Sequence, residues 1–306
     1  MATVAATRLA ELKSAARRDA WYRRLPLLPA LLFVIVCTQL PFLLNIYFSL
    51  TDWKVVPPTP RTFNWGANYG ELFTNQFFRE AVLVSALMTI SAVVLSVLFG
   101  MGLALLLDRQ FFGRGLLRTL LVTPFLMMPV VAALIWKTQI LHSVFGVLNW
   151  VLTRVGLEPV EFVSSLPLWS VVAVLVWEWT PFMMLILLAG LSGQSTDSLE
   201  AARVDGASSP NIFFRITLPG LRPFIELGAL LGSIYLIQVF DEINVLTGGG
   251  PGSTNVPYFV YQRSIGGGWE FGQAAAYSNL VVVVTIIIAT LGLRTLGGLL
   301  PKEGSE

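Results

Sequence analysis

The sequence predicts an all-α transmembrane protein, and its composition supports that prediction directly. Of the 306 residues, 55% are hydrophobic and only 12% are charged, with a mean hydropathy of +0.72. A helix needs about 20 apolar residues to cross the hydrocarbon core of a bilayer. Several runs in this chain reach that length, and in lipid a helix satisfies every backbone polar group of such a run within the segment.

Six membrane-spanning helices are predicted in order along the chain. Four are runs without a charged residue, at 25–51, 81–107, 119–136 and 271–293. Two more contain one acid each: about 166–190, with Glu178, and about 221–240, with Glu226. Prolines at 41, 124, 129 and 181 lie within the spans, where each removes a backbone donor and favours a kink.

Lys and Arg residues are concentrated in alternate segments between the spans. The tail 1–24, the loops 108–118 and 191–222 and the C-terminal end hold 14 of the 20 basic residues, and the other segments hold 6. Because positive charge marks the cytoplasmic side, both termini and the 191–222 loop are expected to face the cytoplasm. One transmembrane domain is thus expected over 25–300, between the tails 1–24 and 301–306.

The polar 191–222 loop predicts a first short helix over 198–205. Asp197 suits the N-cap position, with Glu200 three residues on as its capping-box partner. Gly206 suits the left-handed residue that ends a helix. On this reasoning alone, Glu200 and Gly206 serve only their own helix.

A second short helix is predicted to begin at Ser209-Pro210, with proline in its first turn. The residue before a proline is disfavoured in helical geometry. Pro219 therefore predicts that this second helix stops near Thr217.

The spacing of residues in the 191–222 loop is specific: Glu-Ala-Ala at 200–202, three residues, Gly206, nine residues, Ile216, one residue, then Leu-Pro at 218–219. It resembles the EAA signature of permease subunits of bacterial binding-protein-dependent ABC importers. The resemblance implies a six-helix, type I importer bundle whose loop docks onto an ATPase. The residues that carry this coupling role by resemblance are Glu200, Ala201, Ala202, Asp205, Gly206, Ile216, Leu218 and Pro219.

A second motif follows the fifth span, where Thr-Gly-Gly-Gly-Pro occupies 247–251 and Gln-Ala-Ala-Ala occupies 273–276. From about residue 25 to the end, the chain resembles the carbohydrate branch of that family. It is similar to the larger membrane subunit of maltose-type transporters, in the shorter form with six helices. The glycines themselves predict a tight outer turn, because glycine tolerates positive φ.

The resemblance implies partners rather than an active site on this chain. They are a second homologous permease, two ATPase subunits that bind ATP and magnesium, and an extracytoplasmic sugar-binding protein, all at a bacterial cytoplasmic membrane. No cofactor, metal, catalytic residue or nucleic acid is expected. The chain has no phosphate-binding GxxxxGK[ST] loop, and its one histidine, His142, has no metal-ligand spacing around it.

Polar residues within or beside the spans are candidates for the substrate path, because such groups usually face a cavity or another helix. Aromatic faces beside a carboxylate suit a sugar, and Tyr235 and Gln238 share a helix face with Asp241. The candidates are Glu178, Trp177, Tyr235, Gln238, Asp241 and Asn279. For each of them, hydrogen bonding between helices is the alternative, and for Glu226 an ion pair with Arg222 is expected.

Two other functions fit the composition. A non-sugar solute is possible within the importer reading. An ion-coupled secondary transporter would require several buried acids paired with bases, or an internal repeat. Only Glu178 and Glu226 are candidate buried acids, and no repeat stands out.

Overall fold

The computed structural model describes residues 25–297, so the predicted tails 1–24 and 301–306 lie outside the described residues. Most of the described chain is helical. Its strands are β1 (Thr51–Asp52) and β2 (Thr62–Phe63), which pair antiparallel. The predicted all-α transmembrane class is confirmed.

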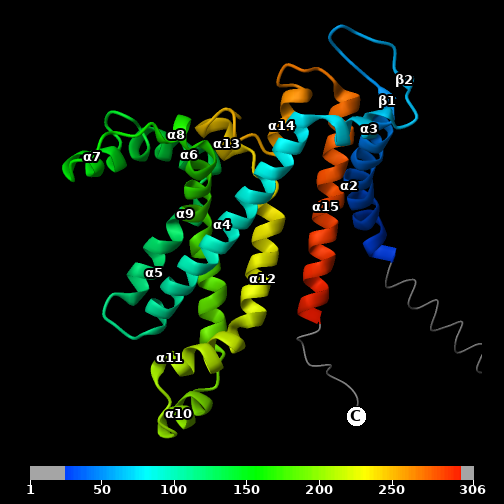
Figure 1. Cartoon of the computed structure of the whole chain (residues 1–306). Coiled ribbons are helices and arrows are strands. Elements are labelled where there is room, and N and C mark those ends of the chain that lie inside the picture. The colour runs from blue at the N-terminus through cyan, green and yellow to red at the C-terminus, as the bar shows by residue number, and fades with distance from the viewer. Residues whose placement is uncertain (1–24, 298–306) are drawn as a thin grey trace, which may run out of the picture.

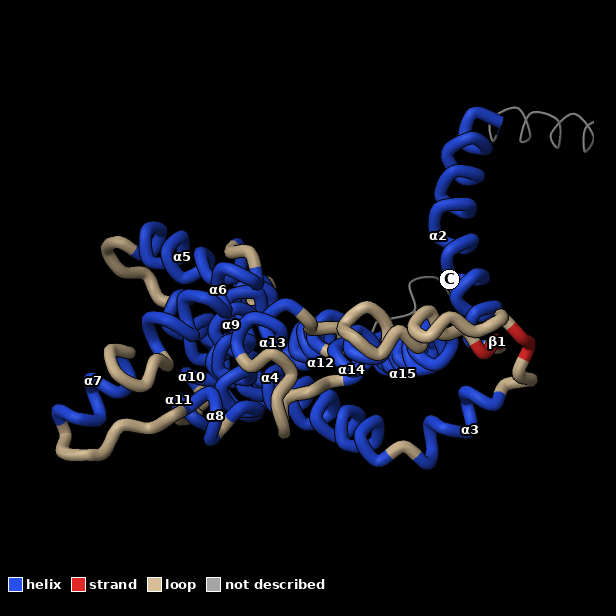
Figure 2. Tube along the Cα trace, turned by 90° about the horizontal axis from the view of Figure 1, so that it is seen from above, coloured by secondary structure: helices blue, strands red, loops and turns tan. Residues whose placement is uncertain are grey.

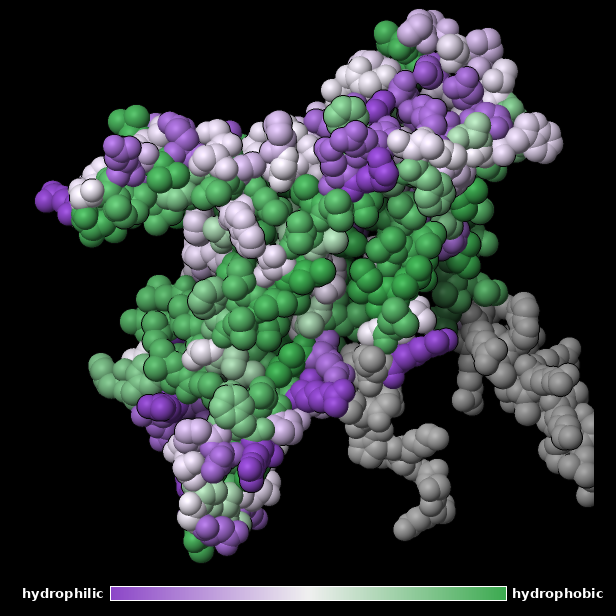
Figure 3. Space-filling model, in the orientation of Figure 1, coloured by the Kyte–Doolittle hydropathy of each residue, from purple (hydrophilic) through white to green (hydrophobic). Residues whose placement is uncertain are grey.

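Four helices of the described chain are long and apolar enough to span a membrane. They are α2 (Leu28–Ser49), α4 (Gln76–Asp108), α9 (Pro167–Ser192) and α15 (Phe271–Gly297). Each lies at a predicted span, although α4 begins five residues before the expected position 81. Figure 3 shows the apolar residues of these helices forming a belt between two polar ends of the molecule.

The third predicted span, 119–136, is not one straight helix. It is divided between α5 (Arg114–Val122) with η2 (Thr123–Leu126) and α6 (Pro129–Ile135) with η3 (Trp136–Ile140), and the two halves meet at 102°. Prolines explain the break: Pro124 and Pro129 donate no backbone hydrogen bond, and Met128 is extended before Pro129. The expected kink is confirmed, and at 102° the bend is sharper than a kink within one continuous helix.

The fifth predicted span corresponds to α12 (Leu218–Leu236), which is not among the described helices that are long and apolar enough to cross a membrane. The prediction that the preceding helix stops near Thr217 is wrong. The chain continues from α11 (Ser209–Ile212) through a π-helical turn, η4 (Phe213–Thr217), into α12, and Leu218 has φ −65°. A π turn relieves the lost hydrogen bond of Pro219 without breaking the helix. α12 is less apolar than the four long helices, because Arg222 and Glu226 form an ion pair on it at 2.7 Å.

Shorter helices complete the described chain. They are η1 (Leu25–Leu27), α3 (Ala67–Thr74), α7 (Val147–Arg154), α8 (Phe162–Ser165), α10 (Thr196–Val204), α13 (Asp241–Leu246) and α14 (Val256–Arg263). In Figure 1, α10 and α11 lie at one end of the molecule, and α3, α13 and α14 lie at the other. α9 and α12 connect these two ends.

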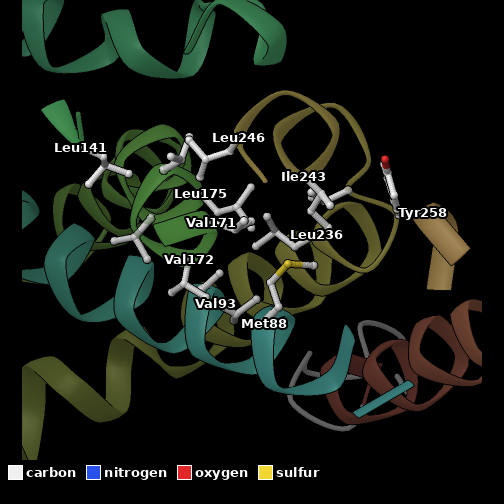
Figure 4. Close-up of a cluster of buried hydrophobic side chains, with 14 residues drawn as sticks. Met88, Val93, Leu141, Val171, Val172, Leu175, Leu236, Ile243, Leu246 and Tyr258 are labelled. Carbon is white, nitrogen blue, oxygen red and sulfur yellow. The ribbon is translucent and has the colours of Figure 1, made fainter. Parts of the chain in front are cut away.

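The core forms where α4 and α9 pack along each other and α12 and α13 cover them. Figure 4 shows its buried side chains converging from all four elements, with Met88 and Val93 facing Val171 and Leu175, and Leu236 beside them. Burial of such side chains removes apolar surface from contact with solvent and fixes the positions of α9, α12 and α13 relative to one another. That arrangement positions the polar residues described below.

Helix α2 stands apart from this core. Figure 2 shows it projecting from the rest of the helices, and no residue of its most apolar 18-residue window is buried. It packs against α15, where Asn45 Nδ2 donates to Asn279 Oδ1 at 2.7 Å and Asn279 Nδ2 donates to Tyr69 Oη at 2.9 Å. This polar cluster holds α2 to α15 and α3.

Candidate functional site

Helix α10 forms the protruding part of the 191–222 loop. It begins at Thr196 with Ser195 in the N-cap position, so the predicted N-cap at Asp197 is wrong, and Asp197 lies in the first turn. No side-chain capping bond forms. The carboxylate of Asp197 lies two residues after the N-cap and instead places negative charge near the positive end of the helix dipole.

The end of α10 has the predicted form. Gly206 adopts φ +82°, its N–H donates to Arg203 O at 3.1 Å, and the Ala207 N–H donates to Ala202 O at 3.0 Å. This pair of bonds is the Schellman motif, in which a left-handed residue closes the helix. The glycine is needed here for its backbone conformation, since a Cβ at this position would meet no atom within 4 Å.

The residues of the expected coupling role lie on two connected elements. Glu200, Ala201, Ala202, Asp205 and Gly206 lie on α10 or at its end, whereas Ile216, Leu218 and Pro219 lie on η4 and the start of α12. No residue of α10 is buried, and the apolar Val204 is 87% exposed.

The base of the 191–222 loop is fixed to the membrane helices. Gln194, just after α9, donates from Nε2 to the Thr217 backbone oxygen on η4 at 2.8 Å. A Cβ on Gly220 would lie 2.8 Å from the same Gln194 Nε2, so the glycine admits this contact. The end of α9 and the start of α12 are therefore joined directly beneath α10.

Near the other end of α12, against the middle of α9, lies a cavity of about 280 Å³, here called the acidic cavity. It is formed where α9, α12, α13 and the broken third span meet. Its lining residues are Phe125, Met127, Pro129, Glu178, Trp179, Tyr235, Gln238, Val239, Phe240, Asp241 and Glu242. Four of the predicted substrate-path residues are among them: Glu178, Tyr235, Gln238 and Asp241.

Glu178 is the most constrained member of the acidic cavity. Its residue is only 5% exposed, and its Oε2 atom has no hydrogen-bond partner in the described chain. Its carboxyl group lies close enough to that of Glu242 for the two to interact. A buried polar atom without a partner costs free energy, so this carboxyl group is held at a cost to stability.

Aromatic rings form the wall beside this carboxyl pair. Trp179 packs against Tyr235 at 5.6 Å between ring centroids and meets Phe125 edge-on at 5.8 Å. Tyr235 is 61% exposed. The cavity thus combines carboxyl acceptors with open aromatic faces, as expected for recognition of a polyhydroxylated ring.

Two predicted residues lie elsewhere. Trp177 points to a separate apolar cavity of about 910 Å³ and meets Trp136 edge-on at 5.9 Å, because residues two apart on a helix face nearly opposite directions. Asn279 lies in the cluster that joins α2 to α15, which is the inter-helix hydrogen bonding that was its alternative. The predicted ion pair between Glu226 and Arg222 is confirmed.

Sequence reasoning did not identify Glu242 as a residue of the acidic cavity. It also selected Trp177 for the substrate path, whereas Trp179 is the tryptophan that lines this cavity. Glu242 is 5% exposed, whereas Asp241 beside it is exposed. The two acids begin α13, and a short helix after a turn gives no periodicity from which the inward side chain could be chosen. Burial raises the pKa of the Glu242 carboxyl, and the negative charge of Asp241 acts in the same direction.

The glycine-rich segment forms the tight turn that was expected. Gly248, Gly249 and Gly252 all have positive φ, and Tyr258 donates from its hydroxyl to Gly248 O at 2.9 Å. This turn connects α13 to α14. Within the described residues, no group of His, Cys, Asp or Glu side chains could hold a metal ion.

Comparison with known proteins identifies the class. Residues 96–297 match the family described as binding-protein-dependent transport system inner membrane component, and the chain belongs to this family. It is 36% identical over 265 residues to the probable ABC transporter permease protein y4oQ of Sinorhizobium fredii, covering 86% of this chain and 85% of that protein.

A second relative and one solved structure extend the comparison. The trehalose/maltose transport system permease protein MalF of Thermococcus litoralis is 33% identical over 280 residues, covering 90% of this chain and 94% of that protein. The fold matches a chain of a bacterial ABC transporter involved in import of the acidic polysaccharide alginate. That match has a TM-score of 0.75 and 21% identity, and it covers 94% of this chain and 98% of that chain. The chain is therefore a multi-pass transport subunit with the type I importer permease fold.

Proposed function

We propose that this chain is the membrane-spanning permease subunit of an ATP-driven importer for a carbohydrate. The observation that carries the proposal is the arrangement along α9 and α12. An exposed helix, α10, lies between them at one end, and an aromatic and carboxyl-lined cavity lies at the far end of α12 and the middle of α9. The sugar-transporting relative supports the carbohydrate class. The substrate is a sugar, an oligosaccharide or a polyol.

The 191–222 loop is the contact for an ATPase subunit. α10 projects from the body of the molecule, as Figure 1 shows, and none of its residues is buried against the rest of the chain. The Glu200 carboxylate is exposed and is available to a basic residue of the partner. Because Gln194 ties the base of the loop to both α9 and η4, a displacement of α10 is passed to both helices.

ATP and magnesium belong to the partner in this proposal. Two ATPase subunits dock on the cytoplasmic side, one on this chain and one on a second, homologous permease that completes the translocation path. An extracytoplasmic sugar-binding protein delivers the substrate at the end where α3, α13 and α14 lie. Both termini face the cytoplasm in this arrangement, in keeping with the excess of basic residues on that side.

An ion-coupled secondary transporter is the alternative with a distinct prediction. It would use Glu178 and Glu242 as a proton or cation site and would need no ATPase. The exposed α10 with its glycine-terminated end has no role in that mechanism, which is why the importer is favoured. A non-sugar substrate within the importer class is the second alternative, and the aromatic wall of the acidic cavity argues against it.

Purification of the native complex under mild conditions tests the proposal. The expected result is co-purification of a second permease and an ATPase, with ATP hydrolysis increased by a sugar-loaded binding protein. Uptake of a panel of sugars and polyols into liposomes that contain the complex then names the substrate. A chain that purifies alone and moves solute without ATP would overturn the importer assignment.

A further inference from the structure

The acidic cavity contains acceptors and lacks cations. Three of its lining residues are acids: Glu178, Asp241 and Glu242. No lining residue is Lys or Arg. The three ion pairs of the described chain lie elsewhere, so no acid of the cavity is neutralised by a basic side chain. Lys137, whose ammonium reaches α13, donates to the Val245 backbone oxygen and not to a carboxylate.

The carboxyl pair lies inside the cavity rather than at its rim. Glu178 and Glu242 are each 5% exposed, and they come from two different helices, α9 and α13, that pack against each other. Both residues line the cavity, whereas the unpartnered Oε2 of Glu178 is itself buried. Two carboxyl groups at close range cannot both be ionised without a high cost, so one member of the pair holds a proton. The remaining oxygens of the pair are acceptors for a donor such as a sugar hydroxyl.

An anionic ligand finds no cationic partner among the lining residues of this chain. A carboxylate or sulfonate transferred from water into a partly buried site must be paired with a cation or with several donors. Gln238 cannot supply them freely, because its Nε2 already donates to Ile234 O at 2.8 Å. A proton held by the carboxyl pair supplies one neutral O–H donor, but no lining residue of this chain supplies a positive charge.

We propose that the acidic cavity is a charge-selective sugar subsite, which accepts a neutral ring through hydroxyl donation to Glu178 and Glu242 and excludes anionic sugars. The proposal rests on the carbohydrate function above and narrows it to uncharged substrates. The volume, about 280 Å³, is near the lower end of the range for small-molecule sites, about 300–1,000 Å³. It therefore suits a small ligand or one part of a longer sugar.

The test compares sugars that differ at C6, where the neutral sugar has a hydroxymethyl group and its anionic partner a carboxylate. The complete transport complex is placed in nanodiscs without its binding protein, and ligand binding is followed by saturation-transfer NMR, which detects weak binding. The probes are matched pairs: glucose with glucuronate, galactose with galacturonate, and mannose with mannuronate. The expected result is that, in each pair that binds, the neutral sugar binds at least about tenfold more tightly, a factor that corresponds to 1.4 kcal/mol.

Variants then assign the selectivity to the carboxyl pair. The double variant Glu178→Gln with Glu242→Gln preserves side-chain size and removes both acids. It should reduce the ratio of neutral-sugar affinity to anionic-sugar affinity to about twofold. Glu226→Gln is the matched control, because Glu226 lies on α12 outside the cavity and pairs with Arg222. It should leave the ratio unchanged. Co-purification of the partner subunits with each variant shows that the complex has assembled.

Three outcomes overturn the proposal: uronic acids that bind as well as their neutral partners, a ratio unchanged by the double variant, or no signal from any sugar. The importer function is read separately, from stimulation of ATP hydrolysis by the sugar-loaded binding protein in the same preparation. A complex with stimulated ATP hydrolysis but no charge selectivity refutes the subsite and leaves the importer intact. A complex without that stimulation refutes the function itself.

Discussion

Gly100 on α4 lies directly against Met183 on α9: a Cβ on the glycine would be 2.8 Å from the Met183 Cβ and 2.9 Å from the Met184 backbone nitrogen. Both are closer than side chains normally approach. The missing side chain therefore sets the separation of the two helices at the centre of the core. Close helix packing of this kind, through small residues, is a main source of association between helices in membranes.

Replacement of Gly100 by alanine is expected to destabilise the protein. The added methyl must push α4 from α9, and such overpacking costs about 1–3 kcal/mol. Thermal unfolding of the purified complex, followed by size-exclusion chromatography after heating, measures the effect. Gly102→Ala is the control, since a Cβ there meets no atom within 4 Å. Equal stability of the two variants would show that the close approach is not important.

Replacement of Gly206 by glutamate is expected to uncouple ATP hydrolysis from transport. A non-glycine residue in left-handed geometry costs about 1–2 kcal/mol, which distorts the end of α10, while the membrane helices are unaffected. The complex should assemble and hydrolyse ATP, and uptake per ATP should fall by about tenfold, the factor for 1.4 kcal/mol. Gly206→Asn should retain coupling, because asparagine tolerates this conformation. Normal uptake by the glutamate variant would contradict the coupling role.

Removal of the Asn45–Asn279 hydrogen bond is expected to loosen α2 from α15. Inter-helix hydrogen bonds in membranes contribute about 0.6–2 kcal/mol. A double-mutant cycle with Asn45→Ala and Asn279→Ala, measured by thermal unfolding, isolates the pair. Thr38→Ala is the control on the same helix, because Thr38 donates only to Val34 O in its own helix. If the effects of the two asparagine changes on the free energy of unfolding are strictly additive, the hydrogen bond does not hold α2 to α15.

Replacement of Gly249 by alanine is expected to disturb the outer turn. Its φ is +64°, and a Cβ there would overlap the Tyr258 ring. Strain of this kind costs about 1–3 kcal/mol, and it displaces α14 at the end proposed to meet the binding protein. Stimulation of ATP hydrolysis by the binding protein should fall. In Gly250→Ala the new Cβ makes an ordinary contact with Thr247 O at 3.5 Å, so stimulation should persist; equal loss in both variants would exclude a role for Tyr258 packing.

Much of the fold could be predicted because hydrophobic length is a local property. The runs at 25–51 and 81–107 become α2 and α4 since no other structure satisfies their backbone in lipid. The third span was not foreseen as a 102° break, because a proline predicts a kink and not its angle. The continuation of the helix through Pro219 depends on a π turn, and no sequence pattern predicts that turn.

The acidic cavity was only partly predictable. Glu178, Tyr235 and Gln238 could be proposed from composition and helical spacing alone. The direction in which Trp177 and Trp179 point depends on how α9 packs against α4 and α12. Glu242 enters the cavity only because α13 folds back onto α9. Contacts between elements distant in sequence are set by tertiary packing, which a single sequence pattern does not encode.

The unbroken course of α11, η4 and α12 has a mechanical consequence. At about 1.5 Å per residue, the 19 residues of α12 alone extend about 28 Å. The residues tied to Gln194 stand at one end of this rod, and Tyr235, in the wall of the acidic cavity, stands near the other. A hinge at Thr217 would absorb a push on α10 as local bending. A continuous helix converts the same displacement of α10 into a tilt of α12. The cavity wall then moves by an amount set by the position of the point about which α12 tilts.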